Sequence, residues 1–289
     1  MITSALQLSS PALAAVHTSG GKWQMTRHLA AIDRVVTAAI LTGGGPRILI
    51  LEAPPRHGKS EYISKRLPPW YLGTHPTKRV ILTSYESNFA RSWGRKARDI
   101  VQEHGHLYGV AVSKGQSAAN NWEIDKYGGG MSTAGVGGSL TGWGADLLIV
   151  DDPIKNAEES LSDYRRESQW DWWQSTASTR IEPGGLAIVM ATRWHADDLS
   201  GRLIAAAESG EGDPVLRVRL PAIAETDDYL GRQPGEALWP QRWPIGKLEQ
   251  RKSAVSGYWW SALYQQSPGR HGSMEWPDAY FAEHIWAIG

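Results

Sequence analysis

The sequence predicts an α/β protein in which a mostly parallel sheet is covered by helices on both faces. Three observations support this prediction. Four short apolar runs lack polar alternation, as expected of strands that are buried on both faces. Segments in which apolar residues recur every three or four positions separate these runs, which is typical of helices. A tight loop containing Gly-Lys-Ser directly follows the first run.

No regular element is predicted before residue 25, and the first helix is expected over residues 25–41. Its apolar positions are spaced three and four residues apart, at Leu29, Ile32, Val36 and Ile40. The glycines at 43–45 should end this helix. The run RILILEA, over residues 47–53, then predicts the first buried strand.

The elements that follow alternate in the same way. We expect strands over residues 79–85, 147–153 and 186–194, a helix over 89–101, a hairpin closed by the glycines at 128–130, and a long helix over 158–177. Beyond residue 212 the sequence becomes rich in Pro and Trp before a helix near 245–255. We therefore expect a core over residues 1–212 and a smaller subdomain over 213–289.

Composition narrows the class of protein. The 289 residues include no cysteine, which excludes disulfides and thiolate metal sites. Lys plus Arg and Asp plus Glu both number 30, so any contact with nucleic acid must come from a local basic surface. The N-terminus lacks the basic start and the apolar run of a signal peptide, and no run reaches the roughly 18 apolar residues of a membrane span. We expect a soluble, intracellular protein.

The segment LEAPPRHGKSE, over residues 51–61, has the pattern of a phosphate-binding loop. In such a loop, backbone N–H groups surround the phosphates, Lys59 would contact the β and γ oxygens, and the Ser60 hydroxyl would ligate Mg²⁺. Ala53 replaces the first consensus glycine, which a small residue can do if its φ is not positive. The expected contacts to ATP are Pro55, Arg56, His57, Gly58, Lys59, Ser60 and Glu61.

The run LLIVDDP supplies the acidic partner that such a loop needs at the end of a neighbouring strand. We assign Asp151, together with Ser60, to Mg²⁺, and Asp152 to polarising the attacking water. Glu158 or Glu159 could serve as the base instead, because glutamate reaches farther. The alternative interpretation is that the acidic pair caps a helix N-terminus.

Two further polar residues could act on the γ-phosphate. Arg56 lies inside the loop and could stabilise transition-state charge, whereas Thr192 ends the fourth apolar run and could place its hydroxyl near that phosphate. Each could equally be an ordinary loop or strand-end residue. His195 is expected to be structural. None of the nine histidines forms an HxxxH pair, and we predict no zinc site.

The helix FARSWGRKARDIV presents a basic face. Arg91, Arg95 and Arg98 fall at i, i+4 and i+7, with Trp93 on the apolar side. This face could contact a phosphate backbone, or it could simply be solvated.

Five sequence blocks together resemble the large terminase subunit of tailed bacteriophages, the ATPase that packages DNA into the capsid. The blocks are PPRHGKSE, SYESNFARSWGRKAR, GGSLTGWGADLLIVDDPIKNAEES, MATRWHADDLSGRL and LYQQSPGRHGSMEW. They occur in the order found in that family and span residues 54–276.

The resemblance implies a P-loop NTPase core of the ASCE type with a small lid subdomain. It also implies that ATP hydrolysis with Mg²⁺ drives double-stranded DNA into a procapsid, with a portal protein and a small terminase subunit as partners. Such a virus- or prophage-encoded subunit would form a homo-oligomeric ring on the portal and could be a monomer in solution. It would act in the host cytoplasm, without a membrane.

The resemblance also implies roles for individual residues of the motifs. The resemblance assigns phosphate and magnesium binding to Lys59, Ser60 and Asp151, a cis arginine to Arg56, and a coupling motif to Thr192. Gln24, in KWQMTRHL, matches the glutamine of the adenine-recognition motifs that lie upstream of the loop in this family.

Two features depart from the family pattern. Trp143 stands where relatives often have a basic residue, so a trans arginine finger is expected from Arg165, Arg166 or Arg180. The family usually continues into an RNase H-like nuclease domain after the linker-like segment near residue 270. We therefore expect no nuclease activity in this chain, whether it is an excised domain or a natural short form.

Two other functions remain open from the residues alone. Another ASCE nucleic-acid translocase, such as a helicase, would share the loop, the acidic pair and the basic helix. A non-hydrolysing assembly module would bind nucleotide without turnover. ATP turnover with and without duplex DNA distinguishes these functions.

Overall fold

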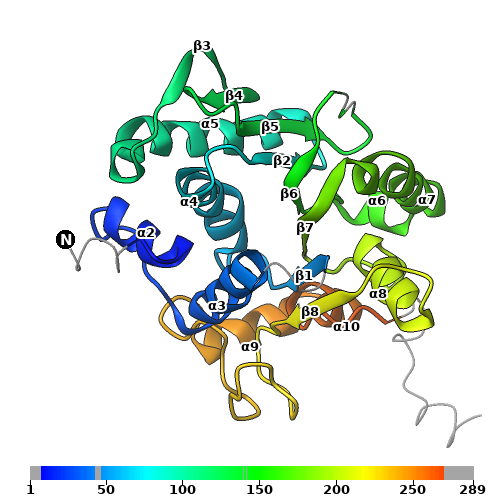
Figure 1. Ribbon diagram of the computed structural model, residues 1–289. Coiled ribbons are helices and arrows are strands. Elements are labelled where there is room, and N and C mark those ends of the chain that lie inside the picture. Colours follow the sequence, from blue (N-terminus) through cyan, green and yellow to red (C-terminus); the bar gives the residue numbers. More distant parts are fainter. Residues whose placement is uncertain (1–7, 43–46, 139, 141, 270–289) are drawn as a thin grey trace, which may run out of the picture.

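The centre of the molecule is an eight-stranded sheet with the order β3-β4-β5-β2-β6-β7-β1-β8 (Figure 1). The structure is a computed structural model that describes residues 8–42, 47–138, 140 and 142–269. The strands are β1 (Ile48–Glu52), β2 (Arg79–Ser84), β3 (Val112–Ala118), β4 (Asn121–Ile124), β5 (Gly130–Gly135), β6 (Ala145–Asp151), β7 (Ile181–Ala191) and β8 (Val215–Arg219). All neighbours from β5 to β8 pair in parallel, and β4 and β3 extend one edge antiparallel. The predicted fold class is confirmed.

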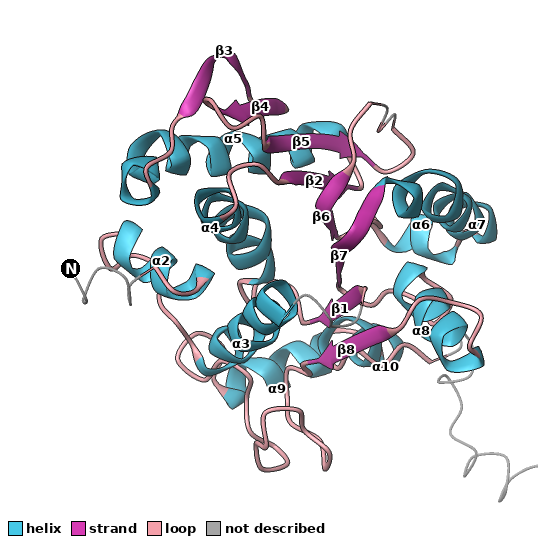
Figure 2. Ribbon diagram, in the orientation of Figure 1, coloured by secondary structure: helices cyan, strands magenta, loops and turns pink. Residues whose placement is uncertain are grey.

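Helices cover both faces of this sheet, as Figure 2 shows. One face carries α2 (Pro11–Thr18), α3 (Arg27–Thr42), α4 (Leu67–Thr74) and α5 (Ser87–His104). The other carries α6 (Ala157–Leu161), α7 (Asp163–Trp172) and α8 (Leu199–Ser209). The C-terminal part adds α9 (Ile245–Ala254) and α10 (Gly257–Trp259). Short turns complete the chain: η1 (Glu61–Arg66), η3 (Trp173–Ala177) and η5 (Trp260–Tyr264) are π-helical, and η2 (Gly105–Tyr108) and η4 (Ser178–Arg180) are 3-10 turns.

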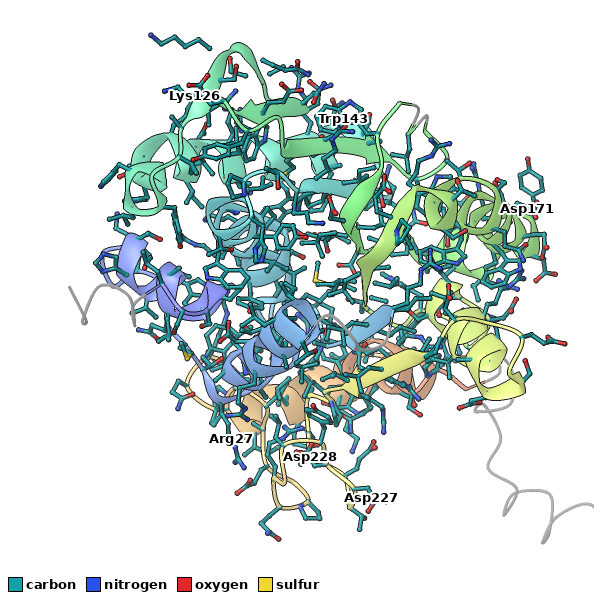
Figure 3. The ribbon with its side chains drawn as sticks, viewed as in Figure 1. Arg27, Lys126, Trp143, Asp171, Asp227 and Asp228 are labelled. Atoms are coloured by element: carbon teal, nitrogen blue, oxygen red, sulfur yellow. The ribbon has the colours of Figure 1, made fainter. Side chains whose placement is uncertain are left out.

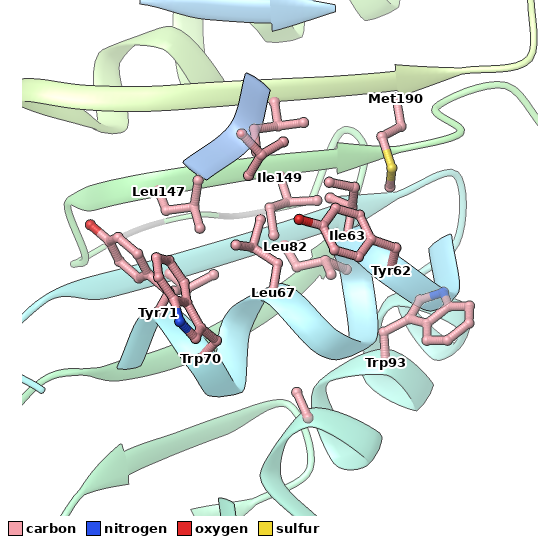
Figure 4. Packing of buried hydrophobic residues seen from close by; sticks show 14 of the residues in the cluster. Tyr62, Ile63, Leu67, Trp70, Tyr71, Leu82, Trp93, Leu147, Ile149 and Met190 are labelled. Carbon is pink, nitrogen blue, oxygen red and sulfur yellow. The ribbon is translucent and has the colours of Figure 1, made fainter. Parts of the chain in front are cut away.

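The core consists of two apolar layers, one on each face of the sheet. Successive strand residues point to opposite faces, so Leu49 and Leu51 of β1 join one layer and Ile48 and Ile50 the other. Figure 4 shows Leu67 and its neighbours in η1 and α4 packed against sheet residues in the first layer. This burial on both faces explains why the strand sequences lack polar alternation.

The structure corrects the sequence-based boundaries in three places. Helix α2 lies in the segment where no element was predicted, because it docks through small alanines rather than a stripe of large residues. The predicted helix over 158–177 is broken at Ser162, whose Oγ accepts a hydrogen bond from the Arg165 N–H and caps α7. Strand β3 is polar and lies at the sheet edge, so it has no apolar pattern to reveal it.

Strand β8 lies beyond the predicted boundary at residue 212, yet it pairs with β1 along its whole length. The central sheet therefore extends to Arg219. The division into a core and a C-terminal subdomain stays a prediction, and a small separate cluster of Ala222, Leu248 and Trp260 lies beyond the sheet. The glycines at 43–45 and the segment after Gly269 lie outside the described residues.

The C-terminal segment returns to the start of α3. Figure 3 shows Arg27 near Asp228, and the Arg27 guanidinium donates a hydrogen bond to the Leu230 carbonyl at 2.7 Å. Arg232 anchors the same loop through a 2.6 Å ion pair with Asp228. Among the described helices, none has the length and apolar character needed to cross a membrane.

Candidate nucleotide site

Three neighbouring parallel strands bring the predicted site residues to one edge of the sheet. In the order β6-β7-β1, Asp151 ends β6, Ala191 ends β7 and Glu52 ends β1. Glu52 pairs with Ala191, and Asp151 pairs with Met190. The phosphate-binding loop, the acidic pair and Thr192 therefore leave the sheet side by side, as expected for carboxyl ends of parallel strands.

The loop is fixed by two buried histidines. The His28 Nε2–H donates to the His57 carbonyl at 2.9 Å, and the His57 Nδ1–H donates to the Pro55 carbonyl at 2.9 Å. Gly58 has a φ of +87°, which a glycine adopts without strain, whereas Ala53 is not among the described residues with positive φ. This explains why alanine can replace the first consensus glycine.

Lys59 joins the loop to both other strands. Its buried Nζ lies 2.5 Å from the Thr192 Oγ1 and 3.1 Å from the Asp152 Oδ2. The Asp152 Oδ1 in turn accepts a hydrogen bond from the Thr192 N–H at 2.8 Å, and Asp152 has a φ of +44°. Three residues that are far apart in sequence thus form one connected polar centre.

Asp151 forms a second centre with two serines. The Ser60 hydroxyl donates to the Asp151 Oδ1 at 2.9 Å, and the Ser64 hydroxyl donates to the Oδ2 at 2.7 Å. Burial, and then the neighbouring Asp152 carboxylate, raise the pKa of Asp151 to about 7. A hydroxyl and a carboxylate are hard oxygen ligands of the kind that Mg²⁺ takes, alongside phosphate oxygens and water.

No group of three or more His, Asp or Glu side chains that could hold a metal occurs within the described ranges. One carboxylate plus one hydroxyl is enough for a magnesium ion that is also held by phosphates. Ser64 was missed by the sequence analysis. Its position four residues after Ser60, on the same helical face, is the pattern that could have identified it.

The remaining predicted residues lie outside these two centres. Glu158 is exposed in the first turn of α6, and no hydrogen bond or ion pair within the described part of the chain joins it to Lys59 or Asp151. Glu61 forms a 2.8 Å ion pair with Lys65. Arg56 is exposed with a φ of +64°, and Gln24 is exposed before α3; both line one cavity beside the loop.

A buried ionic network lies directly behind the loop, and sequence analysis did not predict it. The Arg193 guanidinium pairs with Glu52 at 2.6 Å and with Asp198 at 2.8 Å, and all three residues are buried. Arg217 of β8 approaches the other oxygen of Glu52 at 2.8 Å. Glu52 looked like the end of an apolar strand, and only the pairing of β1 with β7 and β8 reveals its partners.

The same segment is held by the C-terminal part of the chain. The Arg193 N–H donates to the Gln266 Oε1 at 3.1 Å, and the Tyr258 hydroxyl donates to the Trp194 carbonyl at 2.9 Å.

The candidates for a trans arginine finger differ in their surroundings. Arg166 is buried and forms ion pairs with Asp163 and Asp197, so its guanidinium is already engaged. Arg165 is exposed, and Arg180 is half-buried.

The predicted basic face of α5 is only partly free. Arg91 and Arg95 are exposed, whereas Arg98 donates to the Ser117 carbonyl at 2.7 Å and pairs with Asp99 at 2.7 Å.

Comparisons with known proteins indicate a family and a fold. The model of the family described as terminase large subunit, T4likevirus-type, N-terminal, matches residues 50–261. No curated protein sequence matches the chain.

Two solved structures share the fold. The large terminase of bacteriophage HK97 is 13% identical with a TM-score of 0.53, and the match covers 80% of this chain and 49% of that one. The large terminase ATPase domain of Thermus phage P74-26 is 12% identical with a TM-score of 0.52, covering 88% of this chain and 97% of that one. This chain therefore spans about half the length of the HK97 protein.

Proposed function

The chain belongs to the family of N-terminal domains of T4-type large terminase subunits, and from that premise we propose that it is the ATP-hydrolysing motor domain of a viral packaging machine. Hydrolysis would drive double-stranded DNA into a procapsid. The observation that supports this proposal most directly is the convergence of Lys59, Asp152 and Thr192 beside the Ser60–Asp151 pair.

Each residue of the site has a distinct task in this proposal. Lys59 offers its ammonium to the β and γ phosphate oxygens, and Asp152 orients the attacking water and accepts its proton. Ser60 and Asp151 would hold Mg²⁺, which when bound neutralises charge on the phosphates. Arg56 would approach the γ-phosphate from the loop. Thr192 would respond to the state of that phosphate through its hydroxyl.

The other components follow from the family. We propose that the portal protein and the small terminase subunit are partners, that the chain forms a ring on the portal in the host cytoplasm, and that the part beyond Arg219 acts as a lid. Because the formal net charge of the chain is zero, DNA must be held by a local basic surface.

The first test is ATP turnover with and without duplex DNA. Lys59→Ala should abolish turnover at saturating ATP, because Lys59 is the cation that the loop directs into the site. Lys65→Ala is the matched control: Lys65 lies six residues on and pairs with Glu61 at the surface, so it should retain activity. Turnover of Lys59→Ala equal to that of the wild type would refute the proposed ATPase.

A further inference from the structure

A cavity of about 500 Å³ lies directly beside the phosphate-binding loop. Three segments line it: the stretch before α3, with Trp23 and Gln24; the loop itself, with Arg56 and Gly58; and the segment beyond the sheet, with Trp239 and Arg242. A Cβ added at Gly58 would lie 3.9 Å from the Trp239 ring. The C-terminal segment therefore reaches the loop that is expected to hold the phosphates.

The two tryptophans of this cavity each pack against a neighbouring ring. Trp23 stacks on Tyr62 with ring centroids 6.1 Å apart, and the buried Tyr62 hydroxyl donates to Asp33 at 2.7 Å. Trp239 packs against the His28 ring at 5.4 Å. Indole rings are suited to stacking with a planar base.

A tight turn positions Trp239 and Arg242, the C-terminal side of the cavity. The Arg242 and Trp243 N–H groups both donate to the Trp239 carbonyl, at 3.1 and 2.7 Å. The turn brings the Arg242 guanidinium to 5.2 Å from the Trp239 ring centroid. Bases stack on guanidinium planes as well as on aromatic rings.

The charge around the cavity suits an anionic ligand. Lys22, Arg56 and Arg242 contribute three cations to its lining, and the carboxylate of Glu61, which also lines it, is paired with Lys65. A nucleotide would place its phosphates in the loop and its base in the cavity, as the continuity at Gly58 allows.

We propose that Trp239 and Arg242 form the C-terminal wall of the nucleobase site, so that the purine of ATP lies between them and the segment that contains Trp23 and Gln24. This inference rests on the proposed ATPase function. It assigns base contacts to a part of the chain about 180 residues beyond the loop, so that nucleotide binding bridges the core and the C-terminal segment.

A larger cavity of about 830 Å³ is the competing location for the base. It shares Gln24 and Trp239 with the first cavity, but no residue of the phosphate-binding loop lines it. Gln241 lines this larger cavity only. Gln241→Ala is therefore a control within the same turn.

The test compares ATP with inorganic tripolyphosphate, which has the phosphates and no base. Calorimetry in the presence of Mg²⁺ should show that Trp239→Ala weakens ATP binding roughly tenfold, as expected when one stacked ring is removed. Tripolyphosphate binding should be unchanged, because the loop is intact. Trp239→Phe should restore most of the affinity, Arg242→Ala should weaken ATP binding several-fold, and Gln241→Ala should bind ATP like the wild type.

Other results would separate this inference from the function on which it rests. Wild-type ATP affinity in Trp239→Ala and Arg242→Ala would overturn the base site and leave the ATPase intact. An equal loss of ATP and tripolyphosphate binding would overturn it too, because the damage would then lie in the loop. Weakened ATP binding in Gln241→Ala would move the base to the larger cavity. A wild-type chain that binds neither ligand would refute the proposed ATPase itself.

Discussion

Asp151 and Asp152 are adjacent in sequence but have different surroundings. The Asp151 carboxylate is fully buried and its two oxygens accept hydrogen bonds from Ser60 and Ser64. The Asp152 carboxylate instead faces Lys59 and the Thr192 N–H. A residue that is enclosed by hydroxyls is suited to holding a metal ion, and one that lies beside the phosphate-contacting lysine is suited to acting on water.

These surroundings predict different effects of two similar substitutions. Asp151→Asn should weaken Mg²⁺-dependent ATP binding and turnover together. Asp152→Asn should still bind ATP but hydrolyse it roughly 10²–10⁴ times more slowly, because the variant lacks the proton acceptor. Equilibrium binding and single-turnover hydrolysis distinguish the two. Glu158, which is exposed, is the alternative general base. If Asp152→Asn is fully active and Glu158→Gln is inactive, Glu158 accepts the proton of the attacking water.

Local chemistry made part of this site predictable from the sequence. Lys59 and Asp151 could be assigned because each follows an apolar run within a short recognisable motif. The partners of Glu52 could not, because a strand-end glutamate gains its arginines only when β7 and β8 pair on either side of β1. Trp239 lies even farther from any motif and reaches the loop through tertiary packing alone.

Helix α3 is connected to the loop through a pair of histidines that should make stability depend on pH. Burial lowers the pKa of both His28 and His57 to about 4, although their backbone hydrogen bonds oppose the shift. In the unfolded chain these side chains would take up a proton near pH 6.5. At these two histidines the unfolded state therefore binds more protons than the folded state between about pH 6.5 and 4, so their contribution to the free energy of unfolding should fall on acidification through this range.

The expected loss of stability approaches about 3 kcal/mol for each histidine at the acid end of this range. His57→Asn keeps a donor for the Pro55 carbonyl and cannot take up the proton, so its stability should fall less steeply with acidification. Urea unfolding followed by circular dichroism from pH 7 to 4 measures the difference. The exposed His17 supplies the control, since His17→Asn should leave the slope unchanged. Parallel pH profiles for wild type and His57→Asn would show that this histidine does not cause the dependence.

Helix α5 offers two exposed arginines for DNA binding rather than the three that its sequence suggested. The double variant Arg91→Ala/Arg95→Ala should bind duplex DNA more weakly, with a salt slope lower by about 0.9 for each phosphate that is no longer neutralised. Basal ATP turnover should be unchanged. Arg98→Ala should leave the slope unaltered, because its guanidinium is bonded to Ser117 and Asp99. Binding titrations over a range of salt concentrations test this, and an unaltered slope in the double variant would place DNA elsewhere.

Across the whole molecule, the parallel centre of the sheet was predictable and its margins were not. Central strands are apolar on both faces, so they can be recognised in the sequence as apolar runs without polar alternation. This is the case for β1, β2, β6 and β7. Edge strand β3 is polar. Strand β8 mixes arginines with apolar residues, and one of these arginines, Arg217, pairs with Glu52. Pairing at an edge depends on the neighbouring strand more than on the residues of the edge strand itself.

The ionic network behind the loop connects these parts and gives the last prediction. The Arg193 guanidinium compensates the negative charges of the buried Glu52 and Asp198. Its backbone N–H donates a hydrogen bond to the Gln266 side chain. Arg193→Met should therefore destabilise the protein by about 3–5 kcal/mol, because it leaves the buried Asp198 without its cation and Glu52 with the partly exposed Arg217 alone.

Arg217→Ala is the matched control, because Arg217 contacts the same Glu52 from a side chain that is 39% exposed. Removing this side chain should cost only about 1 kcal/mol or less, since solvent screens exposed ion pairs. Urea unfolding of both variants at pH 7 measures the contrast. Equal, small effects in both variants would mean that the buried Glu52 and Asp198 do not depend on Arg193.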